Sequence, residues 1–211
     1  MKKRWLSLLL SALLLFSLVS CGQTGDVEIP TGMQLAAGGP DLGYYFFVPE
    51  EWTVSNLGDV SAAYVSPLTP ASVSLSATEL ADGESAADYF EKSFASFPSS
   101  FALRKAEEGT ACTLGNAEDA VSYVYTYTYQ GKDFRTLQIL AKFEGRAYLY
   151  TYTAPDTKAD GADKTPYEMY VEKARGVISA IKFIGKEDKP AQEKTYETDA
   201  DGYRLVSDGV V

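Results

Sequence analysis

The residues that this chain lacks limit the chemistry open to it. It contains 29 acidic residues and two cysteines, Cys21 and Cys112, but no histidine. This absence removes Ser-His and Cys-His nucleophilic pairs and the usual imidazole metal ligand. No Gly-x-Ser-x-Gly, P-loop or dinucleotide-binding motif occurs either. A pair of carboxylates could still hydrolyse a glycoside, so a carboxylate-based hydrolase stays open as an alternative to a protein that is not an enzyme.

An acidic stretch near the C-terminus partly matches a calcium-binding loop. Glu197, Asp199 and Asp201 alternate along it, and Asp208 stands at the twelfth position. A helix-flanked calcium loop begins with Asp, whereas this stretch begins with Glu197 and no helix is predicted beside it. A solvated turn is the preferred interpretation, and we predict no metal and no cofactor.

Tyrosines recur at every second position in two segments, residues 123–129 and 148–152. Alternate side chains of a strand share one face, so these rows could form a flat aromatic surface for a glycan or a peptide. The residues of this candidate binding face are Trp52, Tyr125, Tyr127, Tyr150 and Tyr152. We prefer the alternative, cross-strand pairs buried beneath the second helix, because aromatic rows on strands are usually packing.

The N-terminus has the parts of a secretory signal. Lys2, Lys3 and Arg4 precede a leucine-rich run, Trp5 to Val19, that is shorter than the roughly 20 residues of a spanning helix. The run ends in Leu18-Val19-Ser20-Cys21, which resembles the lipobox of bacterial lipoprotein signals. This resemblance implies that residues 1–20 are removed and that the Cys21 sulfur carries a diacylglycerol. Acyl chains would then hold the protein at the extracytoplasmic face of the cell membrane.

The net charge of the chain limits the classes of partner that it can bind. Removal of Lys2, Lys3 and Arg4 with the signal would change the formal net charge from −10 to −13. Such a chain is a poor ligand for nucleic acid, which requires a basic footprint. Anionic lipid would repel it as well, so membrane attachment must come from the lipid. If Cys21 is acylated, Cys112 has no partner within the chain and is predicted to be a small buried apolar residue.

Periodicity predicts six strands and two helices. Strands are predicted at 43–48, 60–66 and 72–78, with Pro67 and Pro70 in the loop between the last two, and a three-stranded meander at 118–153. The first helix is predicted to begin after Ser85, with Asp88 completing a capping box, and to stop at Pro98. The second begins after Thr165, with Pro166 in its first position and Glu168 in its box, and is predicted to end at Gly185.

This order predicts an α+β fold, a central antiparallel sheet of about six strands flanked by two main helices. The predicted domain is 41–185, a size usual for one domain. Residues 21–40, rich in glycine, threonine and alanine, are predicted to be a flexible tether.

The segment Tyr45-Phe46-Phe47-Val48-Pro49-Glu50-Glu51-Trp52 resembles the opening of the PsbP-like family, and the order of helices and strands matches over residues 42–184. The resemblance implies an α/β/α sandwich in a non-enzymatic, membrane-associated protein that docks on larger assemblies. The metal-binding histidines of the photosynthetic members have no counterpart here.

Residues 186–211 are predicted to be a polar linker or tail. Within them, 201–209 resembles 31–39, with identities at Gly202/Gly32, Leu205/Leu35 and Gly209/Gly39. One interpretation is that a second copy of the domain starts here; the other is an ordinary polar tail.

The sequence therefore favours a non-catalytic, lipid-anchored extracytoplasmic binding or scaffold domain that docks on envelope proteins or complexes. An envelope hydrolase and a receptor for a small ligand or glycan are the alternatives, and the partner itself is not identified.

Overall fold

The computed structural model describes residues 27–185, 192–199 and 202–210. Its strands are β1 (Met33–Gly39), β2 (Tyr44–Pro49), β3 (Thr53–Val54), β4 (Val60–Ser66), β5 (Thr69–Thr78), β6 (Arg104–Leu114), β7 (Ala117–Tyr129), β8 (Lys132–Phe143), β9 (Arg146–Pro155), β10 (Lys182–Phe183), β11 (Gln192–Asp199) and β12 (Gly202–Val210). The helices are α2 (Ala86–Ser96) and α3 (Pro166–Ala180), and η1 (Ser99–Phe101) is a single 3-10 turn.

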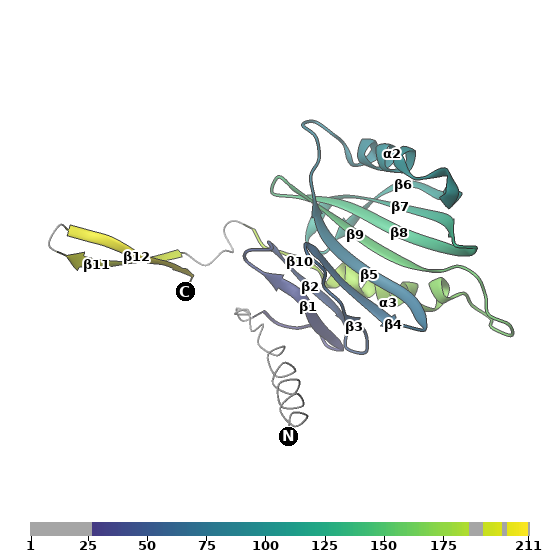
Figure 1. Cartoon of the computed structure of the whole chain (residues 1–211), viewed down its shortest axis with the longest axis horizontal. Helices are drawn as coiled ribbons and strands as arrows, with labels where there is room; N and C mark the ends of the chain where they lie inside the picture. The colour runs from purple at the N-terminus through teal and green to yellow at the C-terminus, as the bar shows by residue number, and fades with distance from the viewer. Residues whose placement is uncertain (1–26, 186–191, 200–201, 211) are drawn as a thin grey trace, which may run out of the picture.

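Seven strands form one antiparallel sheet in the order β3-β4-β5-β9-β8-β7-β6. A second sheet contains β1, β2 and β10, and Figure 1 shows both sheets together with the two helices. A large antiparallel sheet with two main helices is the predicted α+β class.

Two tight turns hold the central meander in register. The β7–β8 turn contains Gln130 and Gly131 at φ 50° and 74°, and the β8–β9 turn contains Glu144 and Gly145 at φ 46° and 78°. Two-residue loops with two positive φ angles match the right-handed twist of the strands that they join. The three-stranded meander predicted at 118–153 is therefore confirmed.

Helix α2 lies on one face of the large sheet, where it covers β7. Ser85 is its N-cap, and the side chains of Ser85 and Asp88 form the predicted capping box. Below the helix, Phe90 is fully buried and contacts Tyr123. With Leu140, Phe90 and Tyr123 belong to a small core of their own.

Helix α3 lies on the opposite face. Thr165 and Glu168 form its capping box, with Pro166 in the first turn as predicted. The helix ends at Ala180 and not at Gly185, because Lys182 and Phe183 pair with β2 as β10. The larger core fills the space between α3, the small sheet and this face of the large sheet.

One expected boundary and one expected sheet assignment are wrong. Residues 33–39 were expected to belong to a flexible tether but form β1, which pairs with β2. The predicted strand 43–48, now β2, lies in the small sheet and not in the central one. The sequence 33–39 gives no strand signal, because small residues fill it and its buried positions, Ala36 and Gly39, are three residues apart and do not alternate.

The large sheet contains an edge strand that was not predicted. Residues 104–114 form β6, an edge strand with three register shifts against β7. Such bulges break the two-residue period from which strands are predicted. Pro70 lies inside β5 and not in the loop, beside the register shift between Tyr64 and Ser66 in the partner strand.

The described part of the C-terminal tail is not a linker. β11 and β12 form a separate two-stranded antiparallel sheet, which Thr195, Tyr196 and Thr198 favour through their strand propensity. The acidic alternation at 197–201 thus begins within β11, and Asp208 lies in β12. β12 covers most of the segment that resembles 31–39, and whether a second copy begins there stays a prediction.

Candidate binding groove

The structure does not bring the predicted aromatic face together. Tyr150 and Tyr152 lie fully buried under α3, where their hydroxyls donate to the carbonyls of Ala174 at 2.8 Å and Tyr167 at 2.9 Å. Burial raises the pKa of both tyrosines well above the usual value. These side chains position α3 along β9, as the preferred packing interpretation expected.

Tyr125 and Tyr127 lie on the opposite face of the sheet, under α2 and η1. Tyr125 is 4% exposed and meets Phe94 edge-on, with ring centroids 5.3 Å apart. Tyr127 is half-buried and stacks on Phe134 at 5.3 Å. The first helix, and not only the second, therefore covers the tyrosine rows.

Trp52 is 2% exposed and packs edge-on against Tyr170 of α3. Its Nε1 is buried and has no hydrogen-bond partner among the described residues. The side chain of Gln34 donates to the Trp52 carbonyl at 2.7 Å and to the Pro49 carbonyl, which fixes the β2–β3 turn. The open aromatic cleft that a glycan receptor would need is not formed by these residues.

An open groove of about 840 Å³ lies elsewhere, between α3 and the face of β6, β7 and β8. Its floor contains Leu137 and Ile139, which are 8% and 3% exposed. Its walls contain the half-buried side chains of Val124, Val171 and Ile178. Val171 and Ile178 lie on the apolar face of α3, so one edge of that face is open to the groove.

Contacts at the C-terminal end of α3 close one end of the groove. The amide of Gly115, in the β6–β7 turn, donates to the Ile178 carbonyl at 2.9 Å. Beside it, the Asn116 side chain donates to the carbonyl of Phe183 at 3.0 Å and accepts from its amide at 2.7 Å. Asn116 thus acts as one further residue of a strand and fixes β10 to the hairpin.

An ion pair closes the other end. The Arg135 guanidinium binds the Asp156 carboxylate at 2.9 Å and 3.0 Å, and it lies 5.2 Å above the centre of the Tyr167 ring. Asp156 also accepts from the Thr165 hydroxyl at 3.4 Å, at the N-cap of α3. β8, the loop before α3 and the helix itself are therefore joined at this point.

The uncovered half-faces of the large sheet differ in chemistry. On the α2 face, the register places Ser72 and Ser74 of β5 beside Thr153 and Thr151 of β9, and Ser76 beside Leu149. On the α3 face, the uncovered half presents Val124, Leu137 and Ile139. Val60, Tyr64 and Leu149 also lie on the α2 half-face, and Val60 is 40% exposed, so the α3 half-face is distinguished by its groove and not by apolar side chains alone.

Cys112 lies at the outer wall of the groove and is a free cysteine. It is half-buried, whereas a buried apolar residue was predicted. Burial raises the pKa of its thiol, which a hydrogen bond with Ser122 partly offsets. The thiol form is therefore favoured at neutral pH, and the thiolate is the reactive form. Cys21 lies outside the described residues.

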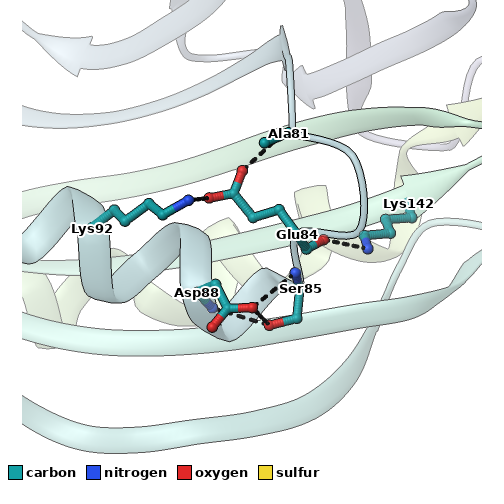
Figure 2. A network of polar contacts seen from close by, with 6 residues as sticks. All are labelled: Ala81, Glu84, Ser85, Asp88, Lys92 and Lys142. Carbon is teal, nitrogen blue, oxygen red and sulfur yellow. Dashed lines mark hydrogen bonds and ion pairs between the residues drawn. The ribbon is translucent and has the colours of Figure 1, made fainter.

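A second hollow, of about 1010 Å³, lies beside the loop 79–85 and contains several carboxylates. Figure 2 shows Glu84 in this loop accepting from the Ala81 amide at 2.9 Å and from Lys92 at 2.6 Å, while Lys142 donates to its carbonyl. The hydrogen bond from Lys92 holds the pKa of Glu84 below its usual value. Because a general acid needs a raised pKa, Glu84 does not support a carboxylate-based hydrolase. Its contacts instead anchor the loop to α2.

Within the described residues, no three His, Cys, Asp or Glu side chains gather closely enough to hold a metal ion. Of the helices in that part of the chain, none has the length and apolarity needed to cross a membrane.

The sequence matches no protein family model and no curated protein. Among solved structures, the yeast Ran-binding protein Mog1p of Saccharomyces cerevisiae matches with a TM-score of 0.50 and 8% identity, over 69% of this chain and 92% of Mog1p. A Bacteroides thetaiotaomicron protein matches with a TM-score of 0.47 and 11% identity, over 72% of this chain and 49% of its own, so this chain spans about half of that protein. LpqN of Mycobacterium tuberculosis, which is involved in cell envelope biogenesis, matches with a TM-score of 0.35 and 16% identity, over 78% of this chain and 88% of LpqN. The likeness to Mog1p shows the fold alone: the chain has the α+β architecture that Mog1p has.

Proposed function

We propose that this chain is a lipoprotein anchored through Cys21 on the extracytoplasmic face of the cell membrane. Its domain, of PsbP-like type, binds a segment of an envelope protein in the groove beside α3 and carries out no catalysis. The lipobox-like sequence Leu18-Val19-Ser20-Cys21 supports the anchor. The fold shared with Mog1p, a Ran-binding protein, supports protein binding.

The observation that carries the binding site is the difference between the two uncovered half-faces. On the α3 side, the sheet and α3 form a groove with half-buried Val124, Val171 and Ile178 in its walls, whereas the α2 side presents serines and threonines together with Val60. Apolar surface costs free energy in contact with water, roughly 25 cal/mol per Å². A groove with half-buried apolar walls and charged residues at its rim is typical of a site that binds a partner.

Photo-crosslinking in living cells tests this site. A photoreactive benzophenone amino acid replaces Ser179, which is exposed and lines the groove. The matched control carries it at Ala95, exposed on α2 across the sheet. We expect an adduct of discrete mass from position 179 only, and its loss when Ser122→Trp fills the groove. Equal labelling from both positions, or none from 179, would reject the groove as the binding site.

The anchor needs its own test. The Cys21→Ala variant should lose membrane association in cell fractionation, because the remaining chain is acidic and offers no basic surface to anionic lipid. Mass spectrometry of the mature N-terminal peptide should find a diacylated cysteine in the parent chain. A variant that stays in the membrane fraction as completely as the parent would contradict the proposal.

A further inference from the structure

We draw no further inference here: the strongest candidate, the hollow beside the loop 79–85, is a cluster of carboxylates (Asp59, Glu79, Asp82 and Glu84), and it carries nothing because the Ala81 amide and Lys92 already bind Glu84 and no unpartnered buried polar side chain of the described residues lines it.

Discussion

Phe90 and Tyr123 lie with their ring centroids 4.2 Å apart, one from α2 and one from β7. From this pair a row of aromatic contacts runs along β7, first with side chains of α2 and then with Phe101 of η1. Phe94 meets Tyr125, and Phe101 meets Tyr127 and Tyr129. Four helical residues rise about 6 Å and two strand residues about 6.6 Å, so the two aromatic repeats stay in step.

The aromatic row should be the main stabilising contact of α2. Replacing the fully buried Phe90 by alanine should lower the free energy of unfolding by about 3–5 kcal/mol, the range for buried phenylalanines. Urea denaturation followed by circular dichroism measures it. Tyr129→Ala, at the end of the row and 47% exposed, should cost less than about 1 kcal/mol. Similar losses for both variants would contradict this account.

A glycine determines how closely the β6–β7 turn approaches α3. Gly115 has a φ of 56°, and a Cβ atom there would lie 2.0 Å from the carbonyl oxygen of Ile181. Gly115→Ala should therefore lower the free energy of unfolding, measured by urea denaturation, by about 3 kcal/mol or more, because backbone strain and the clash add together. Gly131→Ala is the control, because its φ is 74° but nothing lies within 4 Å of its Cβ position. This control substitution should lower the free energy of unfolding by about 1 kcal/mol, because it adds backbone strain without a clash.

Local signals in the sequence predicted the ends of elements where side chains determine them. Ser85 and Thr165 cap their helices with the residues expected three positions later. The alternation of Tyr123 to Tyr129 predicted a strand that the structure confirms. Each of these signals depends on contacts within a few residues, which is why the sequence alone contains them.

The groove depends on long-range placement, which no local pattern contains. Val124, Leu137 and Val171 line the same groove only because α3 lies over β9 and leaves this part of β7 uncovered. The one available signal was the width of the apolar stripe on α3, which includes both Val171 and Ile178. The predicted aromatic face is wrong for a related reason. The register of β7 and β9 on β8, the strand between them, places Tyr125 and Tyr150 on opposite faces of the sheet, and this register cannot be derived from alternation.

The side chain of Asn116 replaces backbone pairing at the edge of β10. It makes two hydrogen bonds, at 2.7 Å and 3.0 Å, to the amide and the carbonyl of the fully buried Phe183. Asn116→Ala should lower the free energy of unfolding, measured by urea denaturation, by about 2–3 kcal/mol, because the amide and the carbonyl of Phe183 lose their partners. Thr157→Ala, in the exposed loop before α3, should stay within about 0.5 kcal/mol. A loss of that small size for Asn116→Ala would show that water replaces the side chain.

The buried tyrosines should make the domain sensitive to alkali. Burial raises the pKa of Tyr125 to about 12 from the ordinary value of 10. Below pH 10 both states are protonated and the stabilisation is complete. Between pH 10 and about 12 the unfolded chain releases a proton that the folded chain retains, so the free energy of unfolding falls as pH rises, by up to about 1.4 kcal/mol per pH unit for this group. Urea denaturation at a series of pH values across this window should give a shallower decline for Tyr125→Phe than for the parent chain. Because Tyr150 and Tyr152 titrate alike in both proteins, parallel declines would mean that the folded domain admits the Tyr125 phenolate.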